Sequence, residues 1–203
     1  MIGAVHDKLI RRRRIRVLSL ALETLLTTDA HILDVGCGDG ELDKRLMKLR
    51  PDIQIEGIDV LARKYAQIPV REFDGRRIPY SDNSIDIAML IDVLHHTEDP
   101  TVLLAEAQRV ARQAVIIKDH CLDGILAGPT LRLMDWTGNA RYEVPLPYNY
   151  WPRSRWLETF EAMHLRVESW QSTLRLYPWP ANLIFDRSLH FLARLSKSLR
   201  LHV

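Results

Sequence analysis

Apolar and polar positions alternate along the chain with two different periods. Between residues 9 and 26 the leucine, isoleucine and valine side chains recur at helical spacing, which predicts an amphipathic leading helix. Short apolar runs follow, and they predict strands at 31–36, 53–59, 69–74, 84–92 and 113–119. The segments between them predict helices at 40–49, 61–67 and 101–112. Short strands that alternate with helices in this way predict a parallel sheet covered by helices on both faces.

After about residue 119 the pattern changes. The stretch 119–155 is rich in glycine, proline and aromatic residues and has weak periodicity, so we interpret it as a helix and a long loop that cover one end of the sheet. Beyond it we expect a helix at 154–164 and a strand at 165–172. The segment 183–201 begins with a strand pattern and is expected to end as a basic amphipathic helix.

The composition is that of one ordinary globular domain. The 203 residues suffice for one full core, with 47% apolar and 27% charged residues, and the net charge of +2 is too small to indicate a nucleic-acid partner. Cys37 and Cys121 form no disulfide framework and have no metal-ligand spacing, which favours a reducing compartment. No stretch approaches the roughly 20 apolar residues of a membrane span. We therefore expect a cytoplasmic protein.

The segment ILDVGCGDGEL places Gly36, Gly38 and Gly40 directly after a predicted strand. Glycine has no Cβ and admits positive φ, so such a turn allows backbone amides to approach a ligand at a helix N-terminus. Asp59 ends the second predicted strand, where a carboxylate can accept hydrogen bonds from ribose hydroxyls. Asp74 follows the third strand and could accept from the amine of adenine. These positions fit a dinucleotide or S-adenosylmethionine, whereas a plain strand-to-helix turn would rarely contain so many glycines.

Four segments, in the right order and spacing, carry a family resemblance. They are ILDVGCGDG, GIDV, FDGRRIPYSDNSIDIAML and IDVLHHTEDP, and they resemble successive motifs of class I S-adenosylmethionine-dependent methyltransferases. Among these enzymes the motifs are most similar to those of the methyltransferase type 11 group, which includes the ubiquinone and menaquinone methyltransferases. The resemblance covers residues 30–118. It implies a Rossmann-like α/β fold with a seven-stranded, mostly parallel sheet whose last strand is antiparallel, and S-adenosylhomocysteine as the product.

The resemblance also implies a division of the chain and a set of cofactor contacts. We expect a single methyltransferase domain over 1–203, made of a leading amphipathic helix (1–28), a cofactor-binding half (30–118), a substrate cover (119–155), and a C-terminal helix, strands and basic helix (156–203). The residues that the resemblance assigns to the cofactor are Asp34, Gly36, Cys37, Gly38, Asp59, Val60, Asp74, Gly75 and Ile91. The glycines of the first turn would approach the methionyl part, and Asp34 would help to hold its amino group. Asp59 would hold the ribose.

Methyl transfer from a sulfonium needs an in-line nucleophile and, where that nucleophile carries a proton, a base. The candidates for the base are His95, His96 and His120. For His95 and His96 the alternative is packing or capping of the next helix. Lys118 and Asp119 could form a structural pair at the end of the fifth strand. No cluster of metal ligands stands out in the sequence, so no metal is expected.

The cover segment offers candidates for contact with a substrate. These are Trp136, Arg141, Tyr148 and Tyr150, with Trp151 beside them. Aromatic side chains at this density can build an apolar pocket. The alternative is a small satellite core beneath a long loop, and a lone arginine is more often a solvated surface residue.

Three functions remain open. The first is methyl transfer from S-adenosylmethionine to a small apolar acceptor, such as a quinone precursor, a phenol or a lipid-like acid. The second is RNA or protein methylation, with the basic block Arg11–Arg14 gripping the partner. A nucleic-acid partner is not expected, because the Asn-Pro-Pro-Tyr-like signature of amino-directed nucleic-acid methyltransferases is missing. The third is a non-catalytic cofactor-binding module. The basic ends of the chain either pack on the domain or make a weak contact with an anionic membrane surface.

Overall fold

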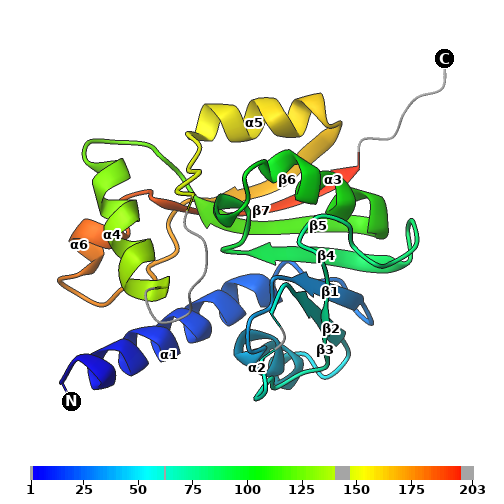
Figure 1. Cartoon of the computed structure of the whole chain (residues 1–203), viewed down its shortest axis with the longest axis horizontal. Coiled ribbons are helices and arrows are strands. Elements are labelled where there is room, and N and C mark those ends of the chain that lie inside the picture. The colour runs from blue at the N-terminus through cyan, green and yellow to red at the C-terminus, as the bar shows by residue number, and fades with distance from the viewer. Residues whose placement is uncertain (1, 62, 140–146, 198–203) are drawn as a thin grey trace.

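The computed structural model describes residues 2–61, 63–139 and 147–197. Its strands are β1 His31–Val35, β2 Gln54–Asp59, β3 Val70–Glu72, β4 Ile85–Ile91, β5 Ala111–His120, β6 Leu165–Gln171 and β7 His190–Lys197. They form one seven-stranded sheet in the order β3-β2-β1-β4-β5-β7-β6 (Figure 1). Neighbouring strands are parallel, except that β7 runs antiparallel to both β5 and β6. The predicted fold class is confirmed, including the antiparallel last strand.

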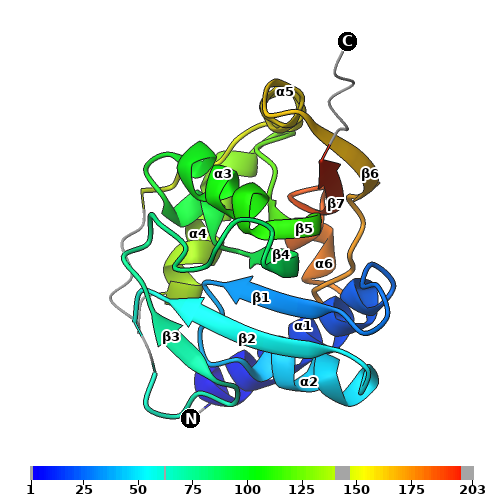
Figure 2. The ribbon, with the colours of Figure 1, turned by 90° about the vertical axis from the view of Figure 1, so that its right-hand side faces the viewer.

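Helices cover both faces of the sheet. They are α1 Ile2–Glu23, α2 Glu41–Leu49, α3 Pro100–Val110, α4 Ala127–Asn139, α5 Arg153–Ala162 and α6 Asn182–Phe185, with a short 3₁₀ helix η1 Leu94–His96. Figure 1 and Figure 2 show α1 and α2 on one face and α3 and α5 on the other. Because side chains alternate along a strand, Ile32 packs in the core beneath α1 and α2, whereas its neighbour Leu33 packs in the core beneath α3 and α5.

The parallel strands β1, β2, β4 and β5 end at a common edge of the sheet. Strand β1 lies between β2 and β4, so the chain segments that follow β1 and β4 leave the sheet on either side of a crevice. Helices α4 and α6 are in contact with each other and lie beyond this edge (Figure 1). Open α/β sheets bind their ligands in such a crevice.

Two predicted helices are wrong. Residues 61 and 63–67 form turns instead of the predicted helix, and Leu61 and Tyr65 are exposed, so these residues bury no apolar face. Most of the stability of a short helix comes from packing such a face. The predicted basic C-terminal helix is replaced by strand β7 at His190–Lys197, and residues 198–203 lie outside the described residues. Strand β7 is buried on both faces between β5 and β6, and its apolar run cannot be told from a helix by periodicity alone.

The two cysteines, Cys37 and Cys121, are both free thiols. Within the described part of the chain, no helix has an apolar stretch long enough to span a membrane.

Candidate active site

A cavity of about 600 Å³ opens at the carboxyl edge of the sheet. Its wall comes from the turn after β1, the end of β2, the loop after β3, and the segment between the end of β4 and α3. Gly36, Gly38, Asp59, Val60 and Gly75, which the sequence assigns to the cofactor, all line it. Motifs that are far apart in the sequence meet on this cavity because each follows the carboxyl end of a parallel strand.

The glycine turn after β1 is shaped by close packing. Gly36 has a φ of 79°, and its N–H donates to the carbonyl oxygen of Ile58 at 2.7 Å. A Cβ placed on Gly36 would lie 2.5 Å from Cγ2 of Val93, so no side chain fits between the turn and the segment after β4. The N–H of Gly38 donates to Oδ2 of Asp59 at 2.8 Å, and this bond ties the turn to the end of β2.

Four other residues assigned to the cofactor are not part of the described cavity wall. Asp34 is buried beside Asp43 of α2, and burial, followed by this neighbouring carboxyl, raises the pKa of Asp34 well above its ordinary value. Burial also raises the pKa of the Cys37 thiol, which therefore stays protonated at neutral pH. Asp74 caps the backbone of the loop that follows it. Ile91 packs against the core beneath α1 and α2. The cofactor roles of these four residues, and of the five that line the cavity, stay predictions.

Comparison with known proteins identifies the domain to which this cavity belongs. Residues 33–117 match the family model described as a methyltransferase domain. The 27-O-demethylrifamycin SV methyltransferase of Amycolatopsis mediterranei (strain S699) is 29% identical over 94 residues, which cover 40% of this chain and 34% of that protein. The O-methyltransferase resE of Aspergillus sclerotiorum is 31% identical over 114 residues, which cover 49% of this chain and 43% of that protein. The matched segments thus span less than half of either relative.

The chain contains a class I S-adenosylmethionine-dependent methyltransferase domain. A chain from the complex that contains the Trm112 methyltransferase activator of Haloferax volcanii has the same fold, with a TM-score of 0.66, 15% identity and 95% of each chain covered. The predicted recognition is confirmed at the level of the class; the ubiquinone-type subgroup stays a prediction.

The cavity of the methyltransferase domain fits S-adenosylmethionine. Oδ2 of Asp59 accepts the N–H of Gly38, and Oδ1 accepts the N–H of Leu61 at 3.0 Å. Each carboxylate oxygen has a further lone pair, so Asp59 can also accept ribose hydroxyls. Val60 and Phe73 give the same part of the wall an apolar surface, which suits an adenine ring. At Gly36 a Cβ would force a rearrangement of the wall.

Of the three histidines that are candidates for the base, His96 lines the cavity. Burial, and then the neighbouring charge of His95, lowers the pKa of His96, so its ring is neutral at pH 7. Its Nδ1 is buried and has no hydrogen-bond partner among the described residues. A neutral imidazole with a free nitrogen can accept a proton. The geometry therefore distinguishes His96 from the other two.

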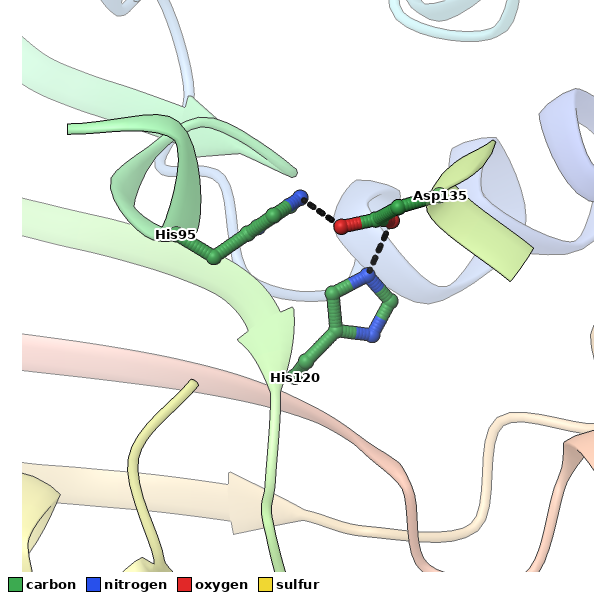
Figure 3. A group of neighbouring side chains, drawn as sticks. All are labelled: His95, His120 and Asp135. Atoms are coloured by element: carbon green, nitrogen blue, oxygen red, sulfur yellow. Dashed lines mark ion pairs between the residues drawn. The ribbon is translucent and has the colours of Figure 1, made fainter. Parts of the chain in front are cut away.

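His95 and His120 do not line the cavity but are buried in the interior, where both rings point toward Asp135 (Figure 3). Nδ1 of His95 is 2.7 Å from Oδ1 of Asp119. Burial lowers the pKa of His95, but the carboxylates of Asp119, Asp135 and Asp92 together outweigh burial and the pKa is raised. Burial, followed by the charge of His95, lowers the pKa of His120.

The expected pair between Lys118 and Asp119 does not form. Neighbouring residues of a strand point to opposite faces of the sheet, so the two side chains diverge. Nζ of the fully buried Lys118 donates to Oδ1 of Asp92, and Arg14 of α1 donates to Oδ2 of Asp92 at 3.1 Å. Asp119 instead pairs with His95. Asp92 lines the cavity, so this buried charge network reaches the wall of the active site.

The structure separates the predicted substrate contacts. Tyr150 is buried, and its hydroxyl donates to Oδ2 of Asp135 on α4 at 2.5 Å. Tyr148 is half-buried beside it, whereas Trp136 is exposed. Arg141 lies outside the described residues. Tyr150 and Tyr148 belong to a small separate core with Leu131 and Leu189, as the alternative of a satellite core expects, whereas Trp151 packs in the main core beneath α3 and α5.

Sequence reasoning missed Asp92, Asp135 and His190 as parts of this region. His190 of β7 has its Nδ1 3.3 Å from Nζ of Lys118. None of the three is close in sequence to the residues it contacts: Asp92 and His190 contact Lys118, and Asp135 contacts His95 and His120. They are brought together by strand pairing and by the packing of α4, which the sequence pattern does not encode locally.

Proposed function

We propose that this protein transfers the methyl group of S-adenosylmethionine to an oxygen of a small, largely apolar acceptor, such as a quinone precursor, a phenol or a lipid-like acid. The observation that carries the proposal is the meeting of Gly36, Asp59 and His96 on one cavity. The names of both curated relatives, each an O-methyltransferase, favour oxygen as the acceptor atom. Val102 and Leu103, which line another part of the wall than the residues assigned to the adenine, favour an apolar acceptor.

The residues of the cavity supply binding, positioning and proton transfer. S-adenosylmethionine, when bound, supplies an electrophilic methyl group on a sulfonium. Asp59 holds the ribose, and the Gly36 turn admits the methionyl part. Neutral His96 accepts the proton of the acceptor hydroxyl as the new oxygen–carbon bond forms and the carbon–sulfur bond breaks. The apolar wall excludes water from the reacting atoms.

The first test is calorimetric titration of S-adenosylmethionine and S-adenosylhomocysteine, with NAD as the comparison ligand. We expect both sulfur compounds to bind and NAD not to bind. Asp59→Ala removes hydrogen bonds to a charged acceptor, and because one such bond is worth about 1.5–3 kcal/mol, affinity should fall by at least about 10–100-fold. Asp52→Ala is the matched control, because Asp52 is an acid in the loop before β2 that pairs with Arg50, away from the cavity. Wild-type affinity in Asp59→Ala would contradict the site assignment.

The acceptor is tested separately, by following S-adenosylhomocysteine release with a panel of phenols, quinols and lipid-like acids. His96→Gln should lower kcat by about 10²–10⁴-fold while leaving the affinity for S-adenosylmethionine unchanged. Cofactor binding without turnover on any acceptor would favour the non-catalytic module instead.

The alternative in which Arg11–Arg14 grip an RNA or protein has less support. Arg11 forms ion pairs with Asp39 and Glu41, and Arg14 forms one with Asp92. Arginines that hold α1 on the domain are less available to an external partner. Salt-sensitive RNA binding that is lost when this block is changed to alanine would favour the alternative. A weak membrane contact through the basic ends and a cytoplasmic location stay predictions.

A further inference from the structure

His95, His120 and Asp135 meet in the interior from three separate elements (Figure 3). His95 belongs to η1, His120 ends β5, and Asp135 lies on the cover helix α4. Their exposed fractions are 2%, 3% and 6%. We propose that these three side chains bind a divalent transition-metal ion, with Zn²⁺ as its representative. Two imidazoles and one carboxylate are a ligand set that such ions prefer.

The distances from the two histidines to Asp135 are those of ligands around an ion. Nε2 of His95 is 3.4 Å from Oδ2 of Asp135, and Nε2 of His120 is 3.6 Å from Oδ1 of Asp135. Hydrogen bonds between nitrogen and oxygen are shorter, at about 2.7–3.2 Å. Two ligands bound at about 2.0–2.2 Å to a tetrahedral ion are about 3.4 Å apart. One ligand atom from each residue lies within 4.8 Å of the others, so a small displacement brings all three onto one ion.

Asp119 orients His95 in the manner of a carboxylate behind a metal-bound histidine. Its Oδ1 is 2.7 Å from Nδ1 of His95 and accepts the N–H of His120 at 2.7 Å, and its Oδ2 accepts the N–H of Leu94 at 3.0 Å. A carboxylate that already accepts two backbone N–H groups is fixed in place and ionised, so Nδ1 of His95 carries the proton between them. Nε2 of His95 is then the nitrogen that faces Asp135, and a metal ion that displaces the proton on Nε2 would bind its lone pair.

The charges around the three side chains also favour a cation. Nε2 of His120 faces two carboxylates, Asp135 at 3.6 Å and Asp92 at 3.7 Å, and its Nδ1 is buried without a hydrogen-bond partner among the described residues. Buried carboxylates need a compensating charge. Lys118 and Arg14 supply it to Asp92. A divalent ion would bind beside these carboxylates, in the space where the two ring nitrogens converge.

The proposed ion has a defined place relative to the cofactor cavity. The neighbouring residue His96 and the nearby Asp92 both line that cavity, so the ion lies directly behind its wall. By binding Asp135, it would fasten the cover helix α4 to the ends of β4 and β5. Three protein ligands also leave a coordination position for water or for an acceptor oxygen.

The test uses the full chain, treated with a chelator and then titrated with Zn²⁺ by calorimetry and with Co²⁺ by visible absorption. We expect about one equivalent of either ion to bind, with the d–d bands of Co²⁺ bound to nitrogen and oxygen ligands. Asp135→Asn and His120→Ala should each weaken binding by at least about 100-fold, and Asp119→Asn by about 10–100-fold. His31→Ala is the matched control, because it removes a surface histidine that pairs with a carboxylate, Glu56, at 2.8 Å.

The outcomes decide between the ion and its competitor, a proton on Nε2 of His95. If the folded wild-type chain takes up no stoichiometric ion, the proton occupies the space and the proposal is overturned. If Asp135→Asn and His120→Ala bind as the wild type does, the ion sits elsewhere and the proposal is also overturned. Circular dichroism checks that each variant folds, and the wild-type titration is decisive even where a variant does not. None of these measurements uses methyl transfer, so the proposed function can fail without affecting them.

Discussion

Gly36→Ala is the substitution whose effect follows most directly from the geometry of the cofactor cavity. Gly36 has a φ of 79°, in the left-handed region that side chains disfavour. The added Cβ would also lie 2.5 Å from Cγ2 and 3.1 Å from Cγ1 of Val93. Contacts this short between carbons cannot persist, so Val93 or the turn after β1 must move. Both Gly36 and Val93 line the cavity, so the movement changes the cofactor site.

Two contributions to the destabilisation can be estimated separately. A left-handed conformation costs a non-glycine residue about 1–2 kcal/mol. Forcing an extra carbon into a packed site costs about 1–3 kcal/mol more. The expected loss in the free energy of unfolding is therefore about 2–5 kcal/mol, a large share of the roughly 5–15 kcal/mol of a typical domain.

Gly124→Ala separates these two contributions. Gly124 has a φ of 98°, but a Cβ placed on it would meet nothing within 4 Å, and it lies outside the cavity wall. Its substitution therefore measures the backbone contribution alone. Urea unfolding should show Gly36→Ala to be less stable than Gly124→Ala by about 1–3 kcal/mol, the cost of the overpacked contact. Calorimetry should show that only Gly36→Ala loses affinity for S-adenosylmethionine.

A second substitution tests whether the contact with Val93 causes the loss of stability. Val93→Ala removes both γ carbons that the new Cβ would meet, so the double variant should recover stability relative to Gly36→Ala alone. The reasoning would be refuted if Gly36→Ala were no less stable than Gly124→Ala and bound S-adenosylmethionine with wild-type affinity. The reasoning would also fail if the double variant lost as much stability as the two single variants lose in sum.

Three further predictions concern other parts of the domain. Burial raises the folded-state pKa of Asp43 to about 6 and that of Asp34 well above its ordinary value. The native state therefore binds protons more tightly than the unfolded state does. The free energy of unfolding should fall as pH rises from about 4 through 6 and above. Urea unfolding at several pH values should show a weaker fall for Asp43→Asn; an unchanged slope would contradict the shifted pKa. Arg109→Ala leaves the buried carbonyl of Ile78, which Nη2 reaches at 2.9 Å, without its donor and should cost about 1–3 kcal/mol. Arg109→Lys should recover less than half of the stability that Arg109→Ala loses, because a single ammonium cannot replace the guanidinium fork. For His96→Gln, the pH dependence of kcat should lose the rising limb that reports the neutral imidazole, and an unaltered profile would remove His96 from the role of base.

The meeting of the Gly36 turn and Asp59 on one cavity was predictable from the sequence because the signals are local. The turn at Gly36 follows strand β1 and precedes α2 within a single short segment, and Asp59 is the last residue of β2. Each signal reports a backbone position at the carboxyl end of a strand, and the topology of a parallel sheet then brings those ends together. No long-range contact had to be known in advance.

The end of the chain was less predictable for a physical reason. Most residues of the run at His190–Lys197 are buried, whichever face of the sheet they point to, because β7 lies between β5 and β6, so the run shows neither the alternation of a half-buried strand nor a clean helical face. Basic residues within the run favoured a helix on the surface. Arg194 instead pairs with Glu168 of the neighbouring strand β6.

The buried contacts that Lys118, Asp119 and His120 make could not have been predicted, although these three residues are consecutive in the chain. The pleat of β5 sends Lys118 and His120 to one face of the sheet and Asp119 to the other. Lys118 and His120 accordingly face Asp92, whereas Asp119 reaches His95 of η1 on the opposite side. Residues 118–120 thus supply buried polar side chains to both faces of the sheet where β5 ends. Asp135 of α4 adds a carboxylate that faces His95 and His120. The chemistry behind the cavity wall therefore depends on strand register, and a shift of one residue in β5 would exchange the two sides.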